Sequence, residues 1–357
     1  MNRLEKCHKI LSESNVQAML CTSYHNKFYL SGLYSHSGYV LVTQQAKYVI
    51  VDSRYYEQVR QNNREGHVLL MTAENTYDMI VNEIIDREDI HTIGVEGDDI
   101  SYDRYITLKG KLHASLVSVN INPIREVKDE REIEKIRSAC EIADQAYLHI
   151  LDFVRPGMQE DEVANELVYF MKKNGAMKES FDTIVASGIR GAMPHAKAGT
   201  KRIEIGDLVT MDFGAKVGQY CSDITRSFAV GKRPGRKLAE VYETVREAQQ
   251  KGIEAIRAGE RFCDVDRAAR SVIEKAGYGE YFGHNLGHSL GISDHEDPRL
   301  SPTEQSRMLA GMVVTVEPGI YIPGLGGVRI EDDVLVTEDG RSVLTHSPKQ
   351  LIITDKE

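Results

Sequence analysis

An internal repeat constrains the fold of this chain more than any other feature of its sequence. Five residues recur with the same identity 102 positions later: Arg155 and Arg257, Gly157 and Gly259, Val163 and Val265, Lys173 and Lys275, and Gly175 and Gly277. Each copy is expected to begin as a pair of helices and to continue into a segment rich in β-branched residues, 205–230 or 311–337. The repeat predicts an ααββ unit present twice, with a site between the two β halves.

The helix pair of the first copy has clear boundary signals. Asp129 followed three residues later by Glu132 predicts a capping box, and apolar residues recur at helical spacing as far as Ile150. This helix should end before Pro156, and a second helix should run to Gly175, a residue type suited to the C-terminal cap.

The preceding residues have a different pattern. Residues 1–125 alternate between expected strands and helices, with an expected hairpin at residues 38–52, and they gather no catalytic residue types. The pattern breaks near residues 122–128, where we expect a linker. At 357 residues the chain suits two domains better than one. We therefore expect an α/β protein with domains at residues 1–125 and 126–357.

Composition excludes several classes of function. Lys and Arg number 44 against 54 Asp and Glu, for a net charge of −10 without a basic block, so no nucleic-acid partner is expected. No apolar run approaches the roughly 18 residues of a membrane span, and the charged N-terminus does not resemble a signal peptide. Five scattered cysteines without a CxxC motif predict reduced thiols in a cytoplasmic protein.

Two aspartates of the first β segment predict a cation site. A two-residue turn at Val217-Gly218 would pair Asp212 directly with Asp223 across a hairpin. Like charges in such a pair destabilise the hairpin unless a cation compensates them. The alternative is a slightly different register, which would leave one aspartate in solvent.

The second β segment supplies two more acids. Glu317 is expected to end an otherwise apolar strand, and Glu331 is expected within a strand, on the same face as Arg329. A glutamate buried in this way is costly unless it is paired or bound to a metal. Arg329 is the alternative partner that would make Glu331 purely structural.

Residues 281–298 contain His284, His288 and His295. The spacing of the first two would suit a metal-binding helix, but the surrounding glycines, and Asn285 in place of the glutamate of HExxH, favour a glycine-rich strand or loop. Four carboxylates and one imidazole suit two divalent ions. Manganese fits this mixture best, with cobalt and zinc as competitors. Two such ions are suited to amide hydrolysis.

The order Asp, Asp, His, Glu, Glu in the contexts MDFG, SDITR, HNLGH, VEPG and RIED resembles the M24 "pita-bread" metallopeptidases. Within that family the sequence is most similar to the Xaa-Pro aminopeptidases and dipeptidases. The resemblance spans the whole chain. It implies a creatinase-like N-terminal domain at residues 1–125, a pseudo-twofold α+β pita-bread catalytic domain at residues 126–357, and a homodimer.

The resemblance also implies roles for individual residues. The implied metal ligands are Asp212, Asp223, His288, Glu317 and Glu331, with Asp223 and Glu331 bridging both ions. The implied catalytic histidines are His195, His284 and His295. His195 matches the family's substrate-side histidine, while His284 and His295 would bind the substrate carbonyl and stabilise the gem-diolate, with proton transfer to the leaving nitrogen. Arg329 is expected to orient a ligand carboxylate. Asn285 and Ser293-Asp294 depart from the usual pattern and would reshape the substrate pocket.

The expected function is a dimetal exopeptidase that cleaves between an N-terminal residue and a following proline. A strict dipeptidase needs a cation for the free carboxylate of its substrate. Lys197 and Arg299 are candidates, but their spacing marks neither. We therefore expect an Xaa-Pro aminopeptidase acting on longer peptides, with an Xaa-Pro dipeptidase as the alternative. The competing hypotheses are a methionine-type aminopeptidase, creatinase-like chemistry, and a catalytically silent pita-bread binding module.

Overall fold

The structure of the chain is a computed structural model that describes residues 2–63 and 65–354. It divides into two compact units, Met1–Arg125 and Glu126–Glu357. None of the helices in the described residues is long and apolar enough to cross a membrane. The five cysteines all lie within the described residues, and each is a buried free thiol.

The N-terminal unit contains a mixed sheet of six described strands in the order β4-β3-β2-β1-β5-β6. The strands are β1 (Ala18–Cys21), β2 (Tyr39–Thr43), β3 (Lys47–Val51), β4 (His67–Leu70), β5 (Thr92–Glu96) and β6 (Ser115–Val119). Strand β2 is antiparallel to both neighbours, and its pairing with β3 confirms the expected hairpin. The other neighbouring strands are parallel.

Helices connect these strands and cover the sheet. They are α1 (Arg3–Glu13), α2 (Tyr24–Ser31), α3 (Ser53–Asn62), α4 (Tyr77–Glu88) and α5 (Tyr102–Lys111), followed by the 3₁₀ helix η1 (Asn122–Arg125). The core of the unit packs α4 against strands β1, β3 and β5, through residues such as Ile84, Leu20, Ile50 and Ile93.

A buried carboxylate ends strand β5. Glu96 accepts hydrogen bonds from the Ser23 backbone N–H at 2.8 Å, the Ser23 hydroxyl at 2.5 Å and Asn26 Nδ2 at 2.5 Å. The Thr22 backbone N–H donates to the same carboxylate. Both carboxylate oxygens of this acid therefore have donors from the segment that follows β1.

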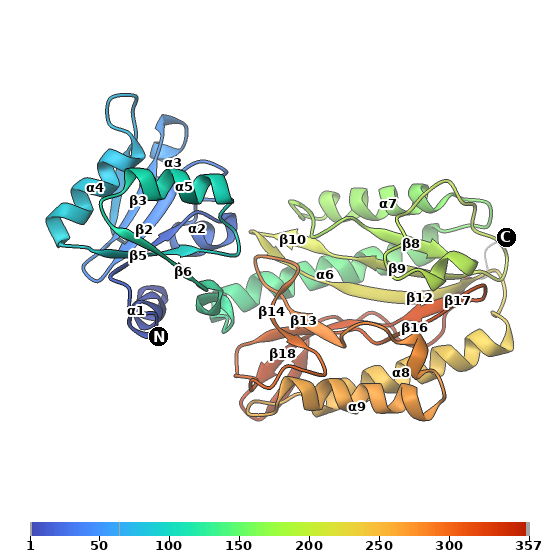
Figure 1. Cartoon of the computed structure of the whole chain (residues 1–357). Coiled ribbons are helices and arrows are strands. Elements are labelled where there is room, and N and C mark those ends of the chain that lie inside the picture. Colours follow the sequence, from blue (N-terminus) through green and yellow to red (C-terminus); the bar gives the residue numbers. More distant parts are fainter. Residues whose placement is uncertain (1, 64, 355–357) are drawn as a thin grey trace. The chain divides into compact units, whose positions relative to one another are not determined.

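The second unit contains two helix pairs and the strands between them (Figure 1). The first pair is α6 (Glu130–Phe153) and α7 (Glu160–Lys173), and the second is α8 (Arg236–Ala255) and α9 (Phe262–Lys275). Helix α9 begins and ends 102 residues after α7, as the repeat predicts. The capping box of α6 is formed by Asp129 and Glu132, and Gly175 follows α7 with a positive φ of 106°.

The strands of this unit also fall into two groups. The first group is β7 (Lys178–Glu179), β8 (Ile184–Ser187), β9 (Leu208–Phe213), β10 (Ala215–Val217), β11 (Tyr220–Cys221) and β12 (Ile224–Val230). The second group is β13 (Gly287–Ser289), β14 (Glu296–Leu300), β15 (Val313–Val316), β16 (Gly319–Ile322), β17 (Gly326–Arg329), β18 (Asp332–Thr337) and β19 (Gly340–Val343). Short 3₁₀ helices are η2 (Gly188–Ala192) and η3 (Gly279–Tyr281).

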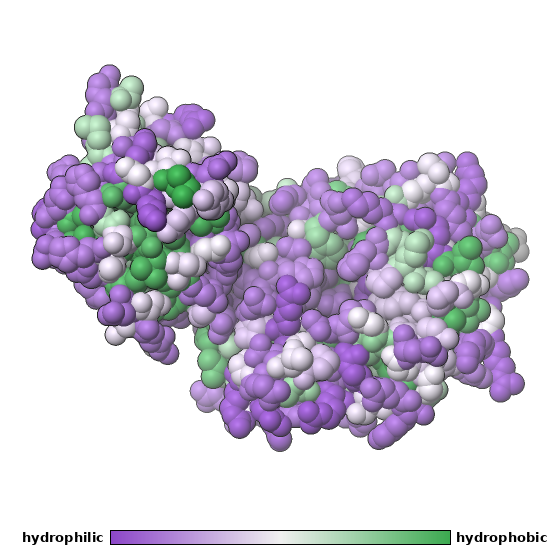
Figure 2. All heavy atoms as spheres, viewed as in Figure 1, coloured by the Kyte–Doolittle hydropathy of each residue, from purple (hydrophilic) through white to green (hydrophobic). Residues whose placement is uncertain are grey.

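Each helix pair packs on its own strands, so this unit has two hydrophobic cores. One core joins α6 and α7 to β9 and β12, and the other joins α8 and α9 to β15 and β18. Polar residues cover most of the unit's surface in the view of Figure 2. The expected pseudo-twofold α+β architecture is therefore confirmed.

A C-terminal segment, residues 346–354, returns across both groups of strands. Its last strand, β20 (Ile353–Thr354), pairs in parallel with β12. Fully buried Arg226 of β12 donates to the carbonyl oxygen of Ser347 at 2.8 Å and to Asp332 Oδ1 at 2.7 Å. Lys349 Nζ donates to the other oxygen of Asp332 at 2.7 Å. The segment thus ties β12 to the start of β18.

Candidate metal centre

The hairpin that carries the first two acids has a register different from the expected one. Val217 pairs with Tyr220, which makes Gly218 and Gln219 the turn residues, and both have positive φ, 54° and 73°. A two-residue turn of the type that matches strand twist needs positive φ at both central positions. The turn therefore starts one residue later than predicted, and Asp212 pairs with Thr225 rather than with Asp223.

Asp223 lies between β11 and β12, outside the ladder that pairs β12 with β9. Its backbone N–H donates to Asp333 Oδ2 at 2.9 Å, and its side chain is buried. The direct cross-strand pairing of two aspartates was thus wrong. The two carboxylates nevertheless line the same cavity, as described below.

Glu317 and Glu331 lie where strands end. Glu317 directly follows β15, as expected, and its Oε1 accepts from the Thr315 hydroxyl at 3.3 Å. Glu331 lies between β17 and β18 instead of within one strand. Its backbone N–H donates to the carbonyl oxygen of Thr225, and its Oε2 accepts from the Thr225 hydroxyl at 2.6 Å. This break in the strands turns the Glu331 side chain toward β12.

His288 lies in strand β13, in agreement with the glycine-rich strand predicted around it. The preceding Gly287 packs so closely on β15 that a Cβ there would lie 2.1 Å from the carbonyl oxygen of Thr315. His288 Nδ1 lies 3.1 Å from the carbonyl oxygen of Ser289, which can only accept a hydrogen bond. The proton is therefore on Nδ1, and the lone pair of Nε2 faces the acids.

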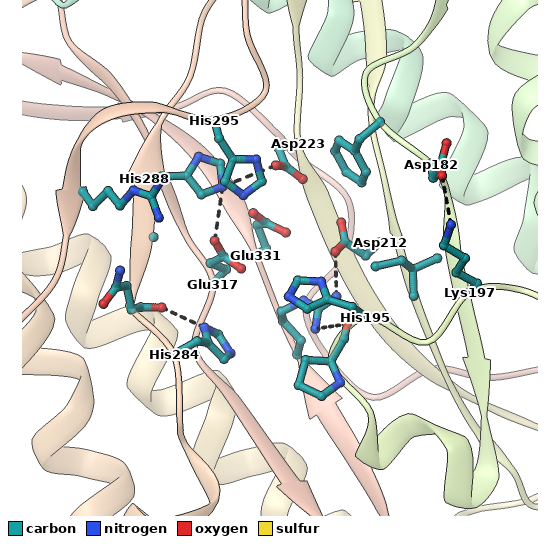
Figure 3. Close-up of a pocket in the computed structure, with 17 residues that line it drawn as sticks. Asp182, His195, Lys197, Asp212, Asp223, His284, His288, His295, Glu317 and Glu331 are labelled. Atoms are coloured by element: carbon teal, nitrogen blue, oxygen red, sulfur yellow. Dashed lines mark hydrogen bonds and ion pairs between the residues drawn. The ribbon is translucent and has the colours of Figure 1, made fainter. Parts of the chain in front are cut away.

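One cavity of about 480 Å³ brings the expected site residues together. It is lined by all five expected ligands, by the three expected catalytic histidines and by Arg329 (Figure 3). His288 Nε2 is 3.3 Å from Glu317 Oε1 and 3.7 Å from Asp223 Oδ2. Asp223, His288 and Glu331 offer ligand atoms that all lie within 4.8 Å of one another.

Arg329 does not pair with Glu331, which removes the purely structural explanation for that acid. Arg329 Nη2 donates to Asp212 Oδ2 at 2.6 Å, and its Nε donates to the Thr225 hydroxyl at 3.0 Å. Because that hydroxyl donates in turn to Glu331, Thr225 connects Arg329 to Glu331 by hydrogen bonds.

Unsatisfied oxygens show that the acids fit a cation. Asp212 Oδ1 and Glu331 Oε1 are buried and have no hydrogen-bond partner among the described residues. The unprotonated Nε2 of His288 faces two carboxylates without a proton to share, an arrangement that is repulsive unless a cation lies between them. The donor set of carboxylates and one imidazole suits hard or borderline divalent ions.

The pKa shifts have the same physical origin. Burial, and then the negative charge of Glu331, raise the pKa of Asp223 well above its usual value. Burial, and then the charge of Glu317, raise the pKa of Glu331 in the same way. Burial raises the pKa of Glu317 to about 7 and lowers that of His288 to about 3. Each shift reflects the cost of burying a charge without a compensating ion.

The three other histidines have different surroundings. His195 is exposed on a turn beyond η2, and His295 is half exposed, with its ring stacked on that of His288 at 3.9 Å between centroids. The hydrogen bond that the His295 ring donates to the Asp294 carboxylate raises the pKa of His295. Burial, and then the charge of Arg329, lower the pKa of His284 to about 4.

The sequence interpretation missed one side chain that the structure joins to the site. The hydroxyl of Tyr321 lies 3.0 Å from His284 Nε2 and accepts from Arg329 Nη1 at 2.8 Å. His284 Nδ1 lies 2.8 Å from the carbonyl oxygen of Asn285, so its proton is on Nδ1 and its Nε2 accepts from Tyr321. Strand β16 pairs with β17, and Gly319 lies opposite Arg329. A prediction of this hairpin from the sequence could have placed Tyr321, two residues after Gly319, close to Arg329.

Comparisons with known proteins agree with this geometry. Residues 134–338 match the model of metallopeptidase family M24, and residues 3–130 match the Creatinase/Prolidase N-terminal domain. An Xaa-Pro dipeptidase of Pyrococcus furiosus is 40% identical over 354 residues, covering 98% of this chain and 99% of the relative.

Two solved structures extend the likeness to the fold. The Xaa-Pro dipeptidase from Bacillus anthracis has a TM-score of 0.95 and 42% identity, covering 98% of this chain and 99% of that chain. The X-Pro aminopeptidase from Thermotoga maritima has a TM-score of 0.89 and 35% identity with the same coverage. The acid cluster, the repeated helix pairs and these matches show that the chain belongs to metallopeptidase family M24 and has the creatinase-type N-terminal domain of that family's prolidase relatives.

Proposed function

We propose that the chain is an Xaa-Pro dipeptidase, which hydrolyses the bond between an N-terminal residue and a C-terminal proline. The observation that carries this proposal is the presence of Arg299 in the same cavity as the acid cluster. A guanidinium there can pair with the free carboxylate of a dipeptide. The relatives named as Xaa-Pro dipeptidases support this choice over the aminopeptidase favoured on the sequence alone.

Lys197 is the less suitable of the two cations. Both cations are exposed and lie near an exposed acid, since Lys197 Nζ is 3.6 Å from Asp182 and Arg299 Nε is 3.4 Å from Asp297, but they differ in their place in the fold. Arg299 is in the strand β14 that pairs with β13, where it lies opposite His288. A substrate carboxylate bound by Arg299 would therefore be fixed in position relative to the acids.

We assign the five residues Asp212, Asp223, His288, Glu317 and Glu331 as ligands of two divalent ions, with Asp223 and Glu331 bridging them. The unsatisfied oxygens and the bare Nε2 of His288 support this assignment. We propose manganese, because oxygen ligands predominate, with cobalt or zinc as the alternative. When bound, the ions supply Lewis acidity toward the scissile carbonyl and lower the pKa of the attacking water.

We assign proton transfer to His284. Its Nδ1–H is committed to the carbonyl oxygen of Asn285, and its Nε2 lone pair accepts from the Tyr321 hydroxyl. Arg329 donates to the same hydroxyl oxygen, so the hydroxyl proton is directed at His284 Nε2 and the imidazole is held beside the acids. Exposed His195 and His295 line the cavity, and we assign them to the substrate carbonyl and the gem-diolate.

In this proposal residues 126–357 carry the catalytic machinery and residues 1–125 form the creatinase/prolidase-like N-terminal domain. We also propose a homodimer in the cytoplasm, on the strength of the family resemblance and the five free thiols. Light scattering on the purified full chain measures the dimer directly, and a monomeric mass would contradict it.

Substrate length tests the dipeptidase proposal. The manganese-loaded chain should cleave alanyl-proline about 10- to 100-fold more efficiently than alanyl-prolinamide or alanyl-prolyl-alanine, because these leave Arg299 without its carboxylate. The variant Arg299→Met should raise the KM for the dipeptide and reduce this preference, whereas Lys197→Met should preserve it. Equal or faster cleavage of the tripeptide by the wild type would show that the chain is an aminopeptidase.

A further inference from the structure

The segment that carries His284 has little regular structure of its own. Residues 282–286 lie between η3 and β13, and Gly283 within them is exposed. Buried backbone groups need hydrogen-bond partners, so such a segment is held in place by whatever satisfies its carbonyl oxygens and N–H groups. For two of these carbonyls the partner is a single side chain of helix α9.

That side chain is Arg270. Its Nη1 donates to the carbonyl oxygen of Phe282 at 3.1 Å, and its Nη2 donates to that of His284 at 2.9 Å. The guanidinium also lies over the Phe282 ring, with 4.2 Å from Cζ to the ring centroid. The Phe282 ring in turn makes an edge contact with the His284 imidazole, at 5.0 Å between centroids and 88° between planes. Arg270 therefore contacts the segment through both its backbone and its rings.

Asp266, one helical turn earlier, fixes the guanidinium. Its two carboxylate oxygens accept from Arg270 Nε at 2.7 Å and Nη2 at 2.8 Å, a bidentate pair in which Asp266 is 1% exposed. Asp266 Oδ1 also accepts from the backbone N–H of Leu286 at 3.1 Å. The planar fork of an arginine is preorganised for such a pair, and its remaining N–H groups then point in a fixed direction.

We propose that Arg270, held by Asp266, is a positioning residue for His284. Together the two side chains bond the segment at Phe282, His284 and Leu286, so they fix the backbone on both sides of the imidazole. Leu286 also donates to the carbonyl oxygen of Leu300 and accepts from the N–H of Glu317, so it has backbone partners besides Asp266. Without Arg270 the imidazole could leave the hydroxyl of Tyr321 while the acid cluster stayed intact, because Leu286 keeps these bonds and His288 is held by the pairing of β13 with β14. The inference rests on the proton-transfer role proposed for His284.

The first experiment compares Arg270→Lys with Arg267→Lys in the manganese-loaded chain. Lysine keeps the charge beside Asp266 but lacks the fork that reaches two carbonyl oxygens. Arg267→Lys is the matched control, because exposed Arg267 lies on the same helix and pairs with half-buried Asp264, away from residues 282–286. We expect Arg270→Lys to lower kcat on alanyl-proline about 10- to 100-fold, with KM and bound manganese unchanged and the control like the wild type.

A double-mutant cycle separates positioning from general destabilisation. If Arg270 acts through His284, Arg270→Lys should cause no further loss of kcat in a His284→Ala background. Multiplying effects, or a full kcat in Arg270→Lys alone, would overturn the proposal. Asp266→Asn provides a second route to the same measurement, because it removes the charge of the pair and keeps an oxygen to accept from Leu286.

Hydrogen exchange tests the hold of Arg270 and Asp266 on residues 282–286, here called the clamp, without a measurement of enzyme activity. The amides of residues 282–286 should exchange at least about tenfold faster in Arg270→Lys than in the wild type, while those of β13 and β15 should not change. Unchanged exchange in 282–286 would overturn the clamp. A wild type without activity on Xaa-Pro dipeptides would instead overturn the proposed function, and the exchange experiment would still decide the clamp.

Discussion

Two groups of buried carboxylates in this chain behave in opposite ways. Glu96 in the N-terminal unit receives hydrogen bonds from Thr22, Ser23 and Asn26 on both of its oxygens. The acids of the cavity in the second unit include two buried oxygens, on Asp212 and Glu331, without a partner among the described residues. Burial alone therefore does not identify a metal site. Several buried acids with unsatisfied oxygens that line one cavity are a stronger sign, because the charges gathered there need a cation or bound protons to compensate them.

Among the variants that test this difference between the two groups of carboxylates, Glu331→Gln should have the largest effect. If Glu331 is a metal ligand as proposed, its removal should abolish metal binding and lower turnover on alanyl-proline about 10³-fold or more, since bound ions would supply several kcal/mol of transition-state stabilisation. Without metal, the same variant should melt at a higher temperature than metal-free wild type, because one charge of a repulsive group is gone. Bound metal is measured by mass spectrometry.

Glu338→Gln, at an exposed position of the same chain, is the control for this variant. It should retain both metal and turnover. Normal turnover in Glu331→Gln would contradict the ligand assignment, and a lower melting temperature of its metal-free form would contradict the repulsion.

The substitution Glu96→Gln should affect only stability. The amide of glutamine would face donors that now bond to a carboxylate, and we expect the free energy of unfolding to fall by about 2–4 kcal/mol. Metal content and kcat of the folded protein should stay at wild-type values. Urea unfolding of the variant beside Glu57→Gln, an exposed acid of α3, measures the difference. Loss of bound metal in Glu96→Gln would contradict the purely structural role of Glu96.

The smallest expected effect is a pH dependence in the N-terminal unit. Lys27 is buried and donates to the carbonyl oxygens of Ser35, Ser37 and Gly38, and burial lowers its pKa from 10.5 to about 8. Between these values the unfolded chain binds more protons than the folded chain at this group. Its contribution to the free energy of unfolding should therefore rise with pH, by about 1.4 kcal/mol per unit.

The difference in urea unfolding between wild type and Lys27→Met, measured across the same pH range, isolates this contribution. Exposed Lys9→Met serves as the control and should follow the wild type. Parallel pH profiles for wild type and Lys27→Met would show that Lys27 keeps its ordinary pKa.

Much of this organisation could be predicted from local signals. The Asp129 capping box and the helical spacing of apolar residues predicted the first helix pair, because both depend on residues close in sequence, and the repeat extended that prediction to the second pair. The register around Asp212 was wrong, because the choice between two turns depends on which residues adopt positive φ. The break between β17 and β18 at Glu331 was also missed, since it depends on contacts with Thr225 about a hundred residues away.

The site shows the same division. The four acids and one histidine of the expected ligand set have a recognisable order in the sequence, whereas Tyr321 and Arg270 act through the conformation of the peptide segments around His284. Tyr321 lies in a short strand after Glu317, and Arg270 lies on an amphipathic helix. Residues without a functional role are common in both places, so the sequence does not distinguish these two side chains. Only the fold shows which atoms they reach.

The segment 346–354 has a consequence for how the catalytic unit is made. Three bonds of the catalytic unit need this segment. Arg226 donates to Ser347, Asp332 accepts from Lys349, and β12 pairs with β20. A ribosome must therefore translate beyond residue 354 before the strands flanking Asp223 and Glu331 have their complete set of hydrogen bonds. The N-terminal unit can fold during synthesis, while the bonds of Arg226, Asp332 and β12 to this segment form only after the last part of the chain has emerged.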